Sequence, residues 1–293
     1  MRQLVILSGK GGTGKTTVAA ALADLVSQEA SIVIADADVD AANLELVLDP
    51  TKLEEHAFVA GKLACIDAAL CTACGTCAEV CRFGAVIAGD GSYAIDGLAC
   101  EGCASCFYGC PVEAVQMEEQ QAGQWYRSDT RYGPLFHAHL FAGQENSGKL
   151  VTLVKQQARL QALDTNARFV IVDGPPGIGC PVISACAGAD LALVVAEPTV
   201  SGVHDLARIL STTEHFGVRS LVLINKADLN LRRAQEVESF CGSRGTTVVG
   251  RVPFDPVVTE AMVRGRPVTA YSDGPVSRKM QQAWETIKGQ FDE

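Results

Sequence analysis

Six short apolar runs are spread along the chain, and helix-length segments separate them through most of its length. Such continuously apolar runs are typical of strands buried on both faces, because a strand with one wet face alternates apolar and polar residues. Strands of this kind that alternate with helices predict a parallel sheet covered on both sides. We therefore expect an α/β fold with a doubly wound, mostly parallel sheet. The expected strands are residues 3–8, 31–36, 169–173, 191–196, 221–225 and 246–250, and the first expected helix is 16–27.

The strand–helix pattern stops between about residues 56 and 120, where eight cysteines form two matching sets. Ile66-Asp67 and the cysteines that follow it recur 29 positions later, beginning at Ile95-Asp96. A duplicated segment of this size predicts a small pseudo-twofold domain inserted into the larger one. We expect the insert to span residues 56–122 and the main domain to consist of residues 1–55 and 123–293.

The composition is that of a packed protein with a net acidic charge and many thiols. Of the 293 residues, 48% are hydrophobic, 34 are acidic, 24 are basic and 12 are cysteine, and the formal net charge is −10. This balance argues against a nucleic-acid partner, which needs a basic footprint. No apolar run is long enough to span a bilayer, and the first residues have no signal-peptide pattern. We therefore expect a cytoplasmic protein without stable membrane insertion, whose reduced thiols bind metal rather than form disulfides.

A glycine-rich loop, Lys10-Gly-Gly-Thr-Gly-Lys15-Thr16-Thr17, lies between the first expected strand and the first expected helix. In that context glycines let the backbone bend so that its N–H groups surround phosphate oxygens, and the helix N-terminus adds its dipole. We expect Lys15 to contact the β- and γ-phosphates and the Thr16 hydroxyl to hold Mg²⁺. The expected phosphate-binding residues are Gly11, Gly12, Thr13, Gly14, Lys15, Thr16 and Thr17.

A second lysine at the start of the loop, Lys10, makes the sequence resemble the deviant Walker A family of P-loop ATPases, which includes MinD, ParA, Mrp and the nitrogenase iron protein. In that family the corresponding lysine reaches across a dimer to the partner's phosphates. The resemblance therefore implies an ATP-dependent homodimer and catalytic roles for Lys10 and Lys15. The alternative for Lys10 is a solvated loop charge. The resemblance covers about residues 1–50 and 167–268.

Acidic residues after two of the expected strands resemble further elements of the same family. Asp36 and Asp38 match its acidic pair, which implies that Asp38 orients the attacking water and that both bind Mg²⁺, directly or through water. A capped strand end is the structural alternative. Asp173, followed by Gly-Pro-Pro-Gly177, resembles the Walker B and switch II element. Asp173 is therefore expected in the Mg²⁺ shell, and Gly177 is expected near the γ-phosphate.

Two later segments resemble the part of the family that contacts the nucleotide base. In the first, Asn225-Lys226-Ala-Asp228, the Asn225 amide offers both a donor and an acceptor to a base edge. The second, Pro253-Phe254, is expected to supply the loop beside the base. The preference for adenine, and so for ATP, is implied by the resemblance alone.

Eight of the nine cysteines of the insert have the spacing of bacterial ferredoxins, in which three cysteines, each separated from the next by two residues, are followed by a fourth after three more residues. In two-cluster ferredoxins the fourth cysteine binds the other cluster, so we expect two 4Fe–4S clusters in a small α+β ferredoxin-like domain. Arg82 stands where the motif has a proline. Two four-cysteine zinc sites are the alternative. The expected ligands are Cys71, Cys74, Cys77 and Cys110 for one cluster and Cys100, Cys103, Cys106 and Cys81 for the other.

The other four cysteines have weaker claims to a site. We expect Cys65 and Cys241 to be packing residues. Cys180 and Cys186 follow the switch II element and are expected to be small buried residues. The alternative for this second pair is a transferable cluster or metal at a dimer interface.

Two histidines, His137 and His139, lie two positions apart in residues 123–149, a segment expected to lead the chain back to the main sheet. A histidine pair suggests a metal, but the sequence offers no third ligand nearby. We expect ordinary strand or loop residues that face the same way.

The complete arrangement resembles the MinD-superfamily ATPases with an inserted ferredoxin domain. It implies an Mg²⁺-dependent ATPase, dimerising on ATP, that couples hydrolysis to low-potential electron transfer or to assembly and delivery of an iron–sulfur or metal cofactor. Its partner would be a redox or cofactor-accepting protein. The alternative is a MinD/ParA-like positioning ATPase whose clusters are structural or redox-sensing. MinD binds membrane through a basic amphipathic C-terminal helix, whereas residues 277–293 have mixed charge and are expected to form a helix packed on the main domain.

Overall fold

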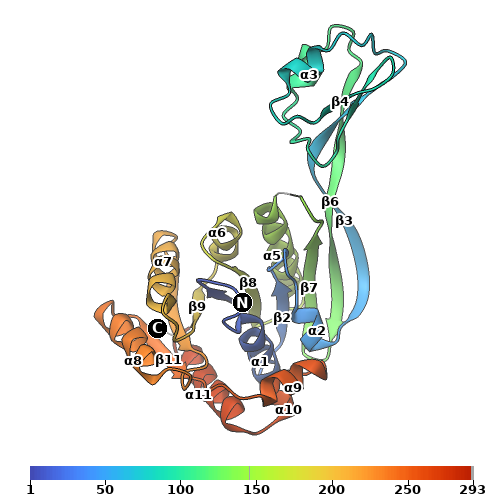
Figure 1. Ribbon diagram of the computed structural model, residues 1–293. Helices are drawn as coiled ribbons and strands as arrows, with labels where there is room; N and C mark the ends of the chain where they lie inside the picture. The colour runs from blue at the N-terminus through green and yellow to red at the C-terminus, as the bar shows by residue number, and fades with distance from the viewer. Residues whose placement is uncertain (145, 292–293) are drawn as a thin grey trace. The chain divides into compact units, whose positions relative to one another are not determined.

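Strands and helices alternate through most of the chain (Figure 1). The computed structural model describes residues 1–144 and 146–291. The strands are β1 (Arg2–Ser8), β2 (Ile32–Asp36), β3 (Thr51–Ile66), β4 (Val86–Ala88), β5 (Tyr93–Ile95), β6 (Val115–Thr130), β7 (Gly133–Leu140), β8 (Phe169–Pro176), β9 (Leu191–Ala196), β10 (Arg219–Ile224) and β11 (Thr247–Arg251). The helices are α1 (Lys15–Ser27), α2 (Leu44–Leu48), α3 (Thr76–Val80), α4 (Ser105–Gly109), α5 (Ser147–Asp164), α6 (Cys180–Cys186), α7 (Gly202–His215), α8 (Leu231–Ser243), α9 (Val257–Val263), α10 (Val268–Tyr271) and α11 (Pro275–Gly289).

The main sheet has the strand order β11-β10-β9-β1-β8-β2-β7-β6-β3. β1 pairs with β8 and β9, β2 pairs with β8 and β7, and β10 pairs with β9 and β11, all in parallel. Every residue of β2 and β9 is buried, as expected for strands covered on both faces. The prediction of an α/β fold with a mostly parallel sheet is confirmed.

Three strands of this sheet, β3, β6 and β7, were not expected from the sequence. β3 is mostly exposed along its length, and its first residues, Thr51 to His56, are largely charged or polar. A pattern of buried apolar residues cannot identify such a strand, because the strand buries little. β6 and β7 are joined by two residues, which makes them an antiparallel hairpin.

The chain divides into two compact units. The larger contains Met1–His56, Trp125–His139 and Ser147–Glu293, and the smaller contains Ala57–Gln124 and Leu140–Asn146. In the larger unit, α11 buries one face, and its Trp284 lies edge-on to Phe169 with ring centroids 5.5 Å apart. The C-terminal segment is therefore a helix packed on the core, as expected. Within the described residues, no helix has both the length and the apolarity needed to cross a membrane.

The two cysteine repeats of the smaller unit have matching backbone conformations. Ala73 (φ 55°) and Gly102 (φ 62°), which are 29 positions apart, are both left-handed, as are Gly75 (φ 82°) and Ala104 (φ 62°). L-residues other than glycine rarely adopt this conformation, so its recurrence at equivalent positions is a specific match.

The two repeats are also hydrogen-bonded to each other. The N–H of Asp67 in the first repeat donates to the Ala114 carbonyl oxygen at 2.8 Å, and the N–H of Asp96 in the second donates to the Ala85 carbonyl oxygen at 2.8 Å. Each repeat therefore begins beside the end of the other. This exchange brings the last cysteine of one repeat toward the first three of the other.

Candidate functional site

The glycine-rich loop joins β1 to α1, which begins at Lys15. Gly12 and Gly14 have positive φ angles of 78° and 94°, a conformation that glycine adopts without strain. The Asn225 side chain holds the loop, because its Nδ2 donates to the Thr13 carbonyl oxygen at 2.8 Å. A Cβ atom at position 14 would lie 2.3 Å from the same Nδ2. Glycine is therefore required here both for the φ angle and for the close approach of Asn225.

Lys15 is buried and faces an acidic cluster. Its Nζ lies 3.6 Å from Oδ2 of Asp38, and Asp36 and Asp173 are completely buried. Burial raises the pKa of Asp38, while the Lys15 charge opposes the shift. Burial also raises the pKa values of Asp36 and Asp173, and the Asp173 charge raises that of Asp36 further. The Lys15 ammonium therefore offsets the charges of Asp38 and Asp173 but not that of Asp36, and the cluster favours an added cation.

Asp36 and Asp173 differ in how their oxygens are satisfied. Asp36 accepts hydrogen bonds from the N–H groups of Asp38, Asn43 and Leu44 at 3.1, 3.1 and 2.9 Å. Neither buried carboxyl oxygen of Asp173, in contrast, has a partner with good hydrogen-bond geometry, although the Thr16 hydroxyl is close enough to lower the pKa of Asp173. An unpaired buried carboxylate is costly, and Mg²⁺ is a hard cation that prefers oxygen ligands. The residues present therefore fit a magnesium ion.

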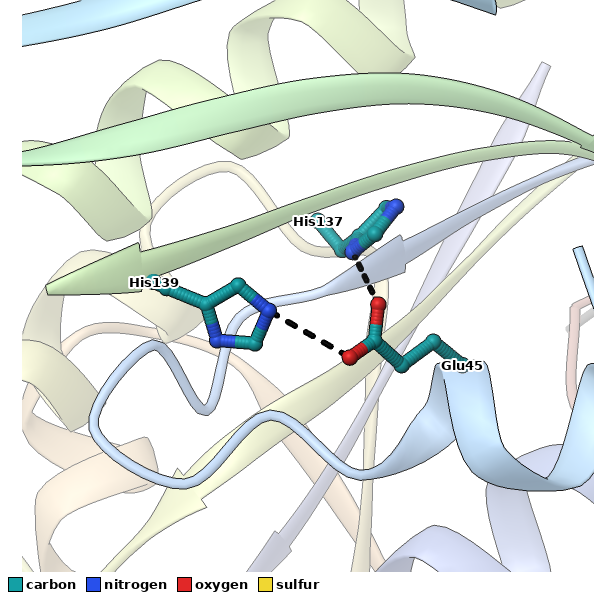
Figure 2. Close-up of side chains that lie close together, drawn as sticks. All are labelled: Glu45, His137 and His139. Carbon is teal, nitrogen blue, oxygen red and sulfur yellow. Dashed lines mark ion pairs between the residues drawn. The ribbon is translucent and has the colours of Figure 1, made fainter. Parts of the chain in front are cut away.

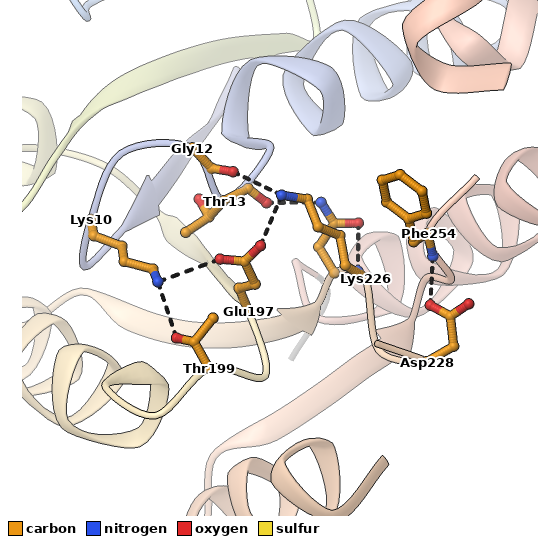
Figure 3. Close-up of polar contacts among 9 residues, drawn as sticks. Lys10, Gly12, Thr13, Glu197, Thr199, Lys226, Asp228 and Phe254 are labelled. Atoms are coloured by element: carbon orange, nitrogen blue, oxygen red, sulfur yellow. Dashed lines mark hydrogen bonds and ion pairs between the residues drawn. The ribbon is translucent and has the colours of Figure 1, made fainter. Parts of the chain in front are cut away.

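Lys10 and Lys226 both contact the carboxylate of Glu197 (Figure 3). Glu197 Oε1 lies 2.8 Å from Lys226 Nζ, and Oε2 lies 3.4 Å from Lys10 Nζ. Lys10 also donates to Thr199 Oγ1 at 3.0 Å, and Lys226 donates to the Gly12 carbonyl oxygen at 3.0 Å. Burial opposes ionisation of Glu197, but the two lysines hold its pKa below the usual value. From the sequence, Glu197-Pro-Thr199 resembles the MinD/Mrp pattern but has no chemical role that could be argued, and the two lysines that contact Glu197 are found only in the structure.

A cavity of about 780 Å³ opens beside the loop, a volume typical of small-molecule sites. Phe254 lines it, and its N–H donates to Asp228 Oδ1 at 2.6 Å, so Asp228 positions the Phe254 segment without lining the cavity itself. Lys10 and Gly177 do not line the cavity. The expected residues that the structure brings together there are Gly11, Gly12, Gly14, Lys15, Thr16, Thr17, Asp38, Asn225, Lys226, Pro253 and Phe254.

Eight of the nine cysteines of the smaller unit divide between two cavities, each lined by four. The members of each set come from both repeats, as the exchange of the repeat ends requires. One cavity contains Cys71, Cys74, Cys77 and Cys110, and the other contains Cys81, Cys100, Cys103 and Cys106. These are the two quartets expected from the ferredoxin-like spacing.

Hydroxyl groups lie beside one thiol of each quartet. Cys74 Sγ lies 3.5 Å from Thr76 Oγ1, and Cys103 Sγ lies 3.4 Å from Ser105 Oγ at the equivalent position. The hydroxyl groups lower the pKa values of Cys74 and Cys103. A lower pKa favours the thiolate, which is the form that binds metal.

The structure corrects part of what was expected of the remaining cysteines. Cys186 and Cys241 are buried, as expected. Cys65 and Cys180 are exposed, so the expectation that they are buried packing residues is wrong. Cys65 lies on β3, where most side chains are exposed, and Cys180 is the first residue of α6.

The histidine pair has a third neighbour that the sequence did not reveal. His137 and His139 lie on β7, and Glu45 of α2 approaches both rings. The expectation that no third ligand is near is therefore wrong. Glu45 is more than ninety positions away along the chain, so only the fold brings it to the histidines.

Comparisons with known proteins agree with the arrangement of the loop and the sheet. Residues 4–268 match the family described as the CobQ/CobB/MinD/ParA nucleotide binding domain. A protein of Methanocaldococcus jannaschii, described as uncharacterized, is 32% identical over 286 residues, which are 98% of this chain and 96% of that protein. The septum site-determining protein MinD of Synechocystis is 24% identical over 272 residues, which are 91% of this chain and 81% of that protein.

Solved structures with the same fold include two of MinD. The septum site-determining protein MinD of Pyrococcus horikoshii, complexed with Mg-ADP, has a TM-score of 0.62 at 18% identity, with coverage of 99% of this chain and 97% of that one. The MinC:MinD cell division complex of Aquifex aeolicus gives a TM-score of 0.61 at 18% identity, with coverage of 99% and 96%. At this level of identity the similarity establishes the fold alone.

Proposed function

Because the chain belongs to the CobQ/CobB/MinD/ParA nucleotide-binding family, we propose that it is an Mg²⁺-dependent ATPase whose nucleotide cycle acts on two 4Fe–4S clusters held by the smaller unit. The observation that carries the proposal is the division of eight cysteines into two cavities of four. It occurs in the same chain as a phosphate loop with a buried lysine.

The nucleotide half of the proposal rests on the large cavity and its charges. Lys15 and the N–H groups of the loop would bind the phosphates, and Asn225, Lys226, Pro253 and Phe254 would line the base end. Mg²⁺, held by the Thr16 hydroxyl and the acidic cluster, would neutralise charge on the phosphates. Asp38 would orient the attacking water from its position beside Lys15.

The proposed dimer depends on Lys10. Its Nζ is bonded within the chain to Thr199 and lies near Glu197, outside the nucleotide cavity. In an ATP-bound dimer this lysine would exchange those partners for the phosphates of the other protomer. Gly177, which has a φ of 91° at the end of β8, would respond to the γ-phosphate.

The cluster half is tested by analysis of anaerobically purified protein. About eight irons and eight sulfides per chain are expected, together with EPR signals from two reduced clusters. Cys110→Ser and Cys81→Ser should each lose about half of the iron, from different clusters. Cys65→Ser, which changes a cysteine of the same unit outside both cavities, should retain all of it. Zinc in place of iron would overturn the proposal.

Two tasks for such clusters are separated by one further measurement. If the protein gates electron transfer, ATP should change the reduction potential of the clusters or the rate at which a partner is reduced. If it delivers a cofactor, iron should pass to an apo-protein while the potential remains unchanged. Eight cysteine ligands in two complete sets of four favour permanent clusters, and therefore the first task.

A second candidate function is spatial positioning, favoured by the relatives named septum site-determining protein MinD. The apolar face of α11 is buried against the core, which leaves this helix without a free face to insert into a membrane. Co-sedimentation with anionic liposomes or with DNA in the presence of ATP tests this candidate directly. Clear ATP-dependent binding would favour positioning over cluster chemistry.

A further inference from the structure

The larger unit has a cluster of nitrogen and oxygen ligands outside the nucleotide cavity. It consists of Glu45 on α2 and of His137 and His139 on β7 (Figure 2). Residues two apart on a strand point to the same face, so both imidazoles lie on one side of β7. In Figure 2 the two oxygens of the Glu45 carboxylate are each directed at one of the two rings.

The distances match those between ligands of one metal ion. Glu45 Oε2 lies 3.1 Å from His137 Nδ1, and Glu45 Oε1 lies 3.3 Å from His139 Nε2. One ligand atom from each of the three residues can be chosen so that all lie within 4.8 Å of one another. In a tetrahedral site with bonds of about 2.0–2.1 Å, ligand atoms are about 3.3 Å apart. A modest rotation of the partly exposed His139 would therefore complete the geometry.

The strongest evidence is the state of His137. Its side chain is 1% exposed, and its Nε2 lies 2.9 Å from Ser128 Oγ. Its Nδ1 is buried without a hydrogen-bond partner, although the Glu45 carboxylate is close by. The Ser128 hydroxyl can donate to Nε2 or accept from it, so this contact is compatible with either tautomer of His137. In the tautomer with the proton on Nε2, the Nδ1 lone pair faces a Glu45 carboxylate oxygen, with no donor between the two acceptors. A bound cation resolves this arrangement.

Ser128 would act as a typical outer partner of a metal-binding histidine. Such histidines commonly use their second ring nitrogen in a hydrogen bond that fixes the orientation of the ring.

Lys52 is a nearby charge that could compete with a metal ion. Its Nζ lies 3.7 Å from the centroid of the Tyr126 ring and 3.8 Å from Glu55 Oε2. The ammonium is therefore directed at an aromatic face and at a different carboxylate.

We propose that Glu45, His137 and His139 form a binding site for a divalent transition metal of the zinc type. Two imidazoles and one carboxylate are a ligand set that zinc uses when a fourth position remains open to water or to an external ligand. Imidazole ligands disfavour Mg²⁺ and Ca²⁺, which prefer oxygen. The Glu45 and His139 side chains are 29% and 40% exposed, so the open position would face solvent. The site requires neither nucleotide nor clusters.

The test measures zinc retained by the full-length protein. Wild type, Glu45→Gln, His139→Gln and His204→Gln are dialysed against micromolar Zn²⁺ under anaerobic conditions, and bound zinc is then quantified. His204 is the matched control, because it is an exposed histidine whose Nδ1 lies 3.8 Å from Asp205 Oδ1. All four proteins have the same cysteines, so zinc held by thiols cancels in the comparison.

We expect wild type and His204→Gln to retain one more zinc per chain than the other two variants. Zinc should also raise the Tm of wild type and His204→Gln more than that of Glu45→Gln or His139→Gln, because a ligand stabilises the state that binds it. Circular dichroism checks that each variant is folded, and His139→Gln should be, because His139 is partly exposed. Equal zinc and equal Tm shifts in all four proteins would overturn the proposal.

Discussion

The ion pair between Lys15 and Asp38 should compete with nucleotide, and Asp38→Asn tests this directly. The two side chains are 6% and 12% exposed, and Nζ and Oδ2 are 3.6 Å apart. In the absence of nucleotide, Asp38 is the counter-ion of a lysine that is expected to bind phosphate. Replacing Asp38 with asparagine keeps the size of the side chain, releases Lys15 and removes a negative charge that repels phosphate.

The separation sets the scale of the effect. At an effective dielectric constant of 20, two unit charges 3.6 Å apart attract by about 5 kcal/mol. Most of this is offset by the cost of burying the carboxylate, which is also what raises the pKa of Asp38. A net change of about 1–2 kcal/mol in favour of phosphate corresponds to roughly 5- to 30-fold tighter binding of ADP.

Calorimetric titration with ADP in EDTA measures this change without a contribution from Mg²⁺. Hydrolysis of Mg-ATP by the same variant should fall by about 100-fold or more, since the variant lacks the group that we propose orients the attacking water. Asp40→Asn is the control, because Asp40 also lines the cavity but is exposed. Unchanged ADP affinity in Asp38→Asn, or equal tightening in Asp40→Asn, would refute the idea that a specific ion pair competes with phosphate.

Three further substitutions test the fold around the site. Gly14→Ala places a Cβ 2.3 Å from the Asn225 amide nitrogen at a φ of 94°. We therefore expect the free energy of unfolding to fall by about 1–3 kcal/mol and nucleotide to bind more weakly, and an unchanged Tm would contradict the predicted strain. Lys155→Met removes three hydrogen bonds of 2.6–2.8 Å from the Lys155 ammonium to carbonyl oxygens at the end of α6. The free energy of unfolding in urea should fall by about 2–4 kcal/mol, and an unchanged value would contradict this role. Trp284→Ala should cost about 3–5 kcal/mol in the same assay, because the ring is 2% exposed, and a loss below 1 kcal/mol would mean that α11 is not part of the core.

Local patterns were sufficient to predict the parts of the structure that repeat a local rule. β9 was predicted with its observed bounds, because six consecutive apolar residues are typical of a strand that is buried on both faces. The grouping of the cysteines into two sets of four was predicted because the ferredoxin-like spacing occurs twice, and in such proteins the fourth cysteine of each repeat joins the first three of the other. The role of Glu197 was missed, because its two lysine partners, Lys10 and Lys226, lie far from it in the sequence and contact it only in the folded structure.

The Glu45 site depends on contacts that no local pattern contains. β2 and β7 are separated by about 100 residues, and their parallel register, with Ala35 beside Phe136, places His137 level with Asp36. Asp36 in turn accepts the N–H of Leu44 at 2.9 Å and so fixes the start of α2, one residue before Glu45. The acidic cluster of the nucleotide site therefore also determines where Glu45 lies. His137 and His139 therefore gain Glu45 as a third ligand only because Asp36, a buried residue of the acidic cluster, holds the start of α2 in place.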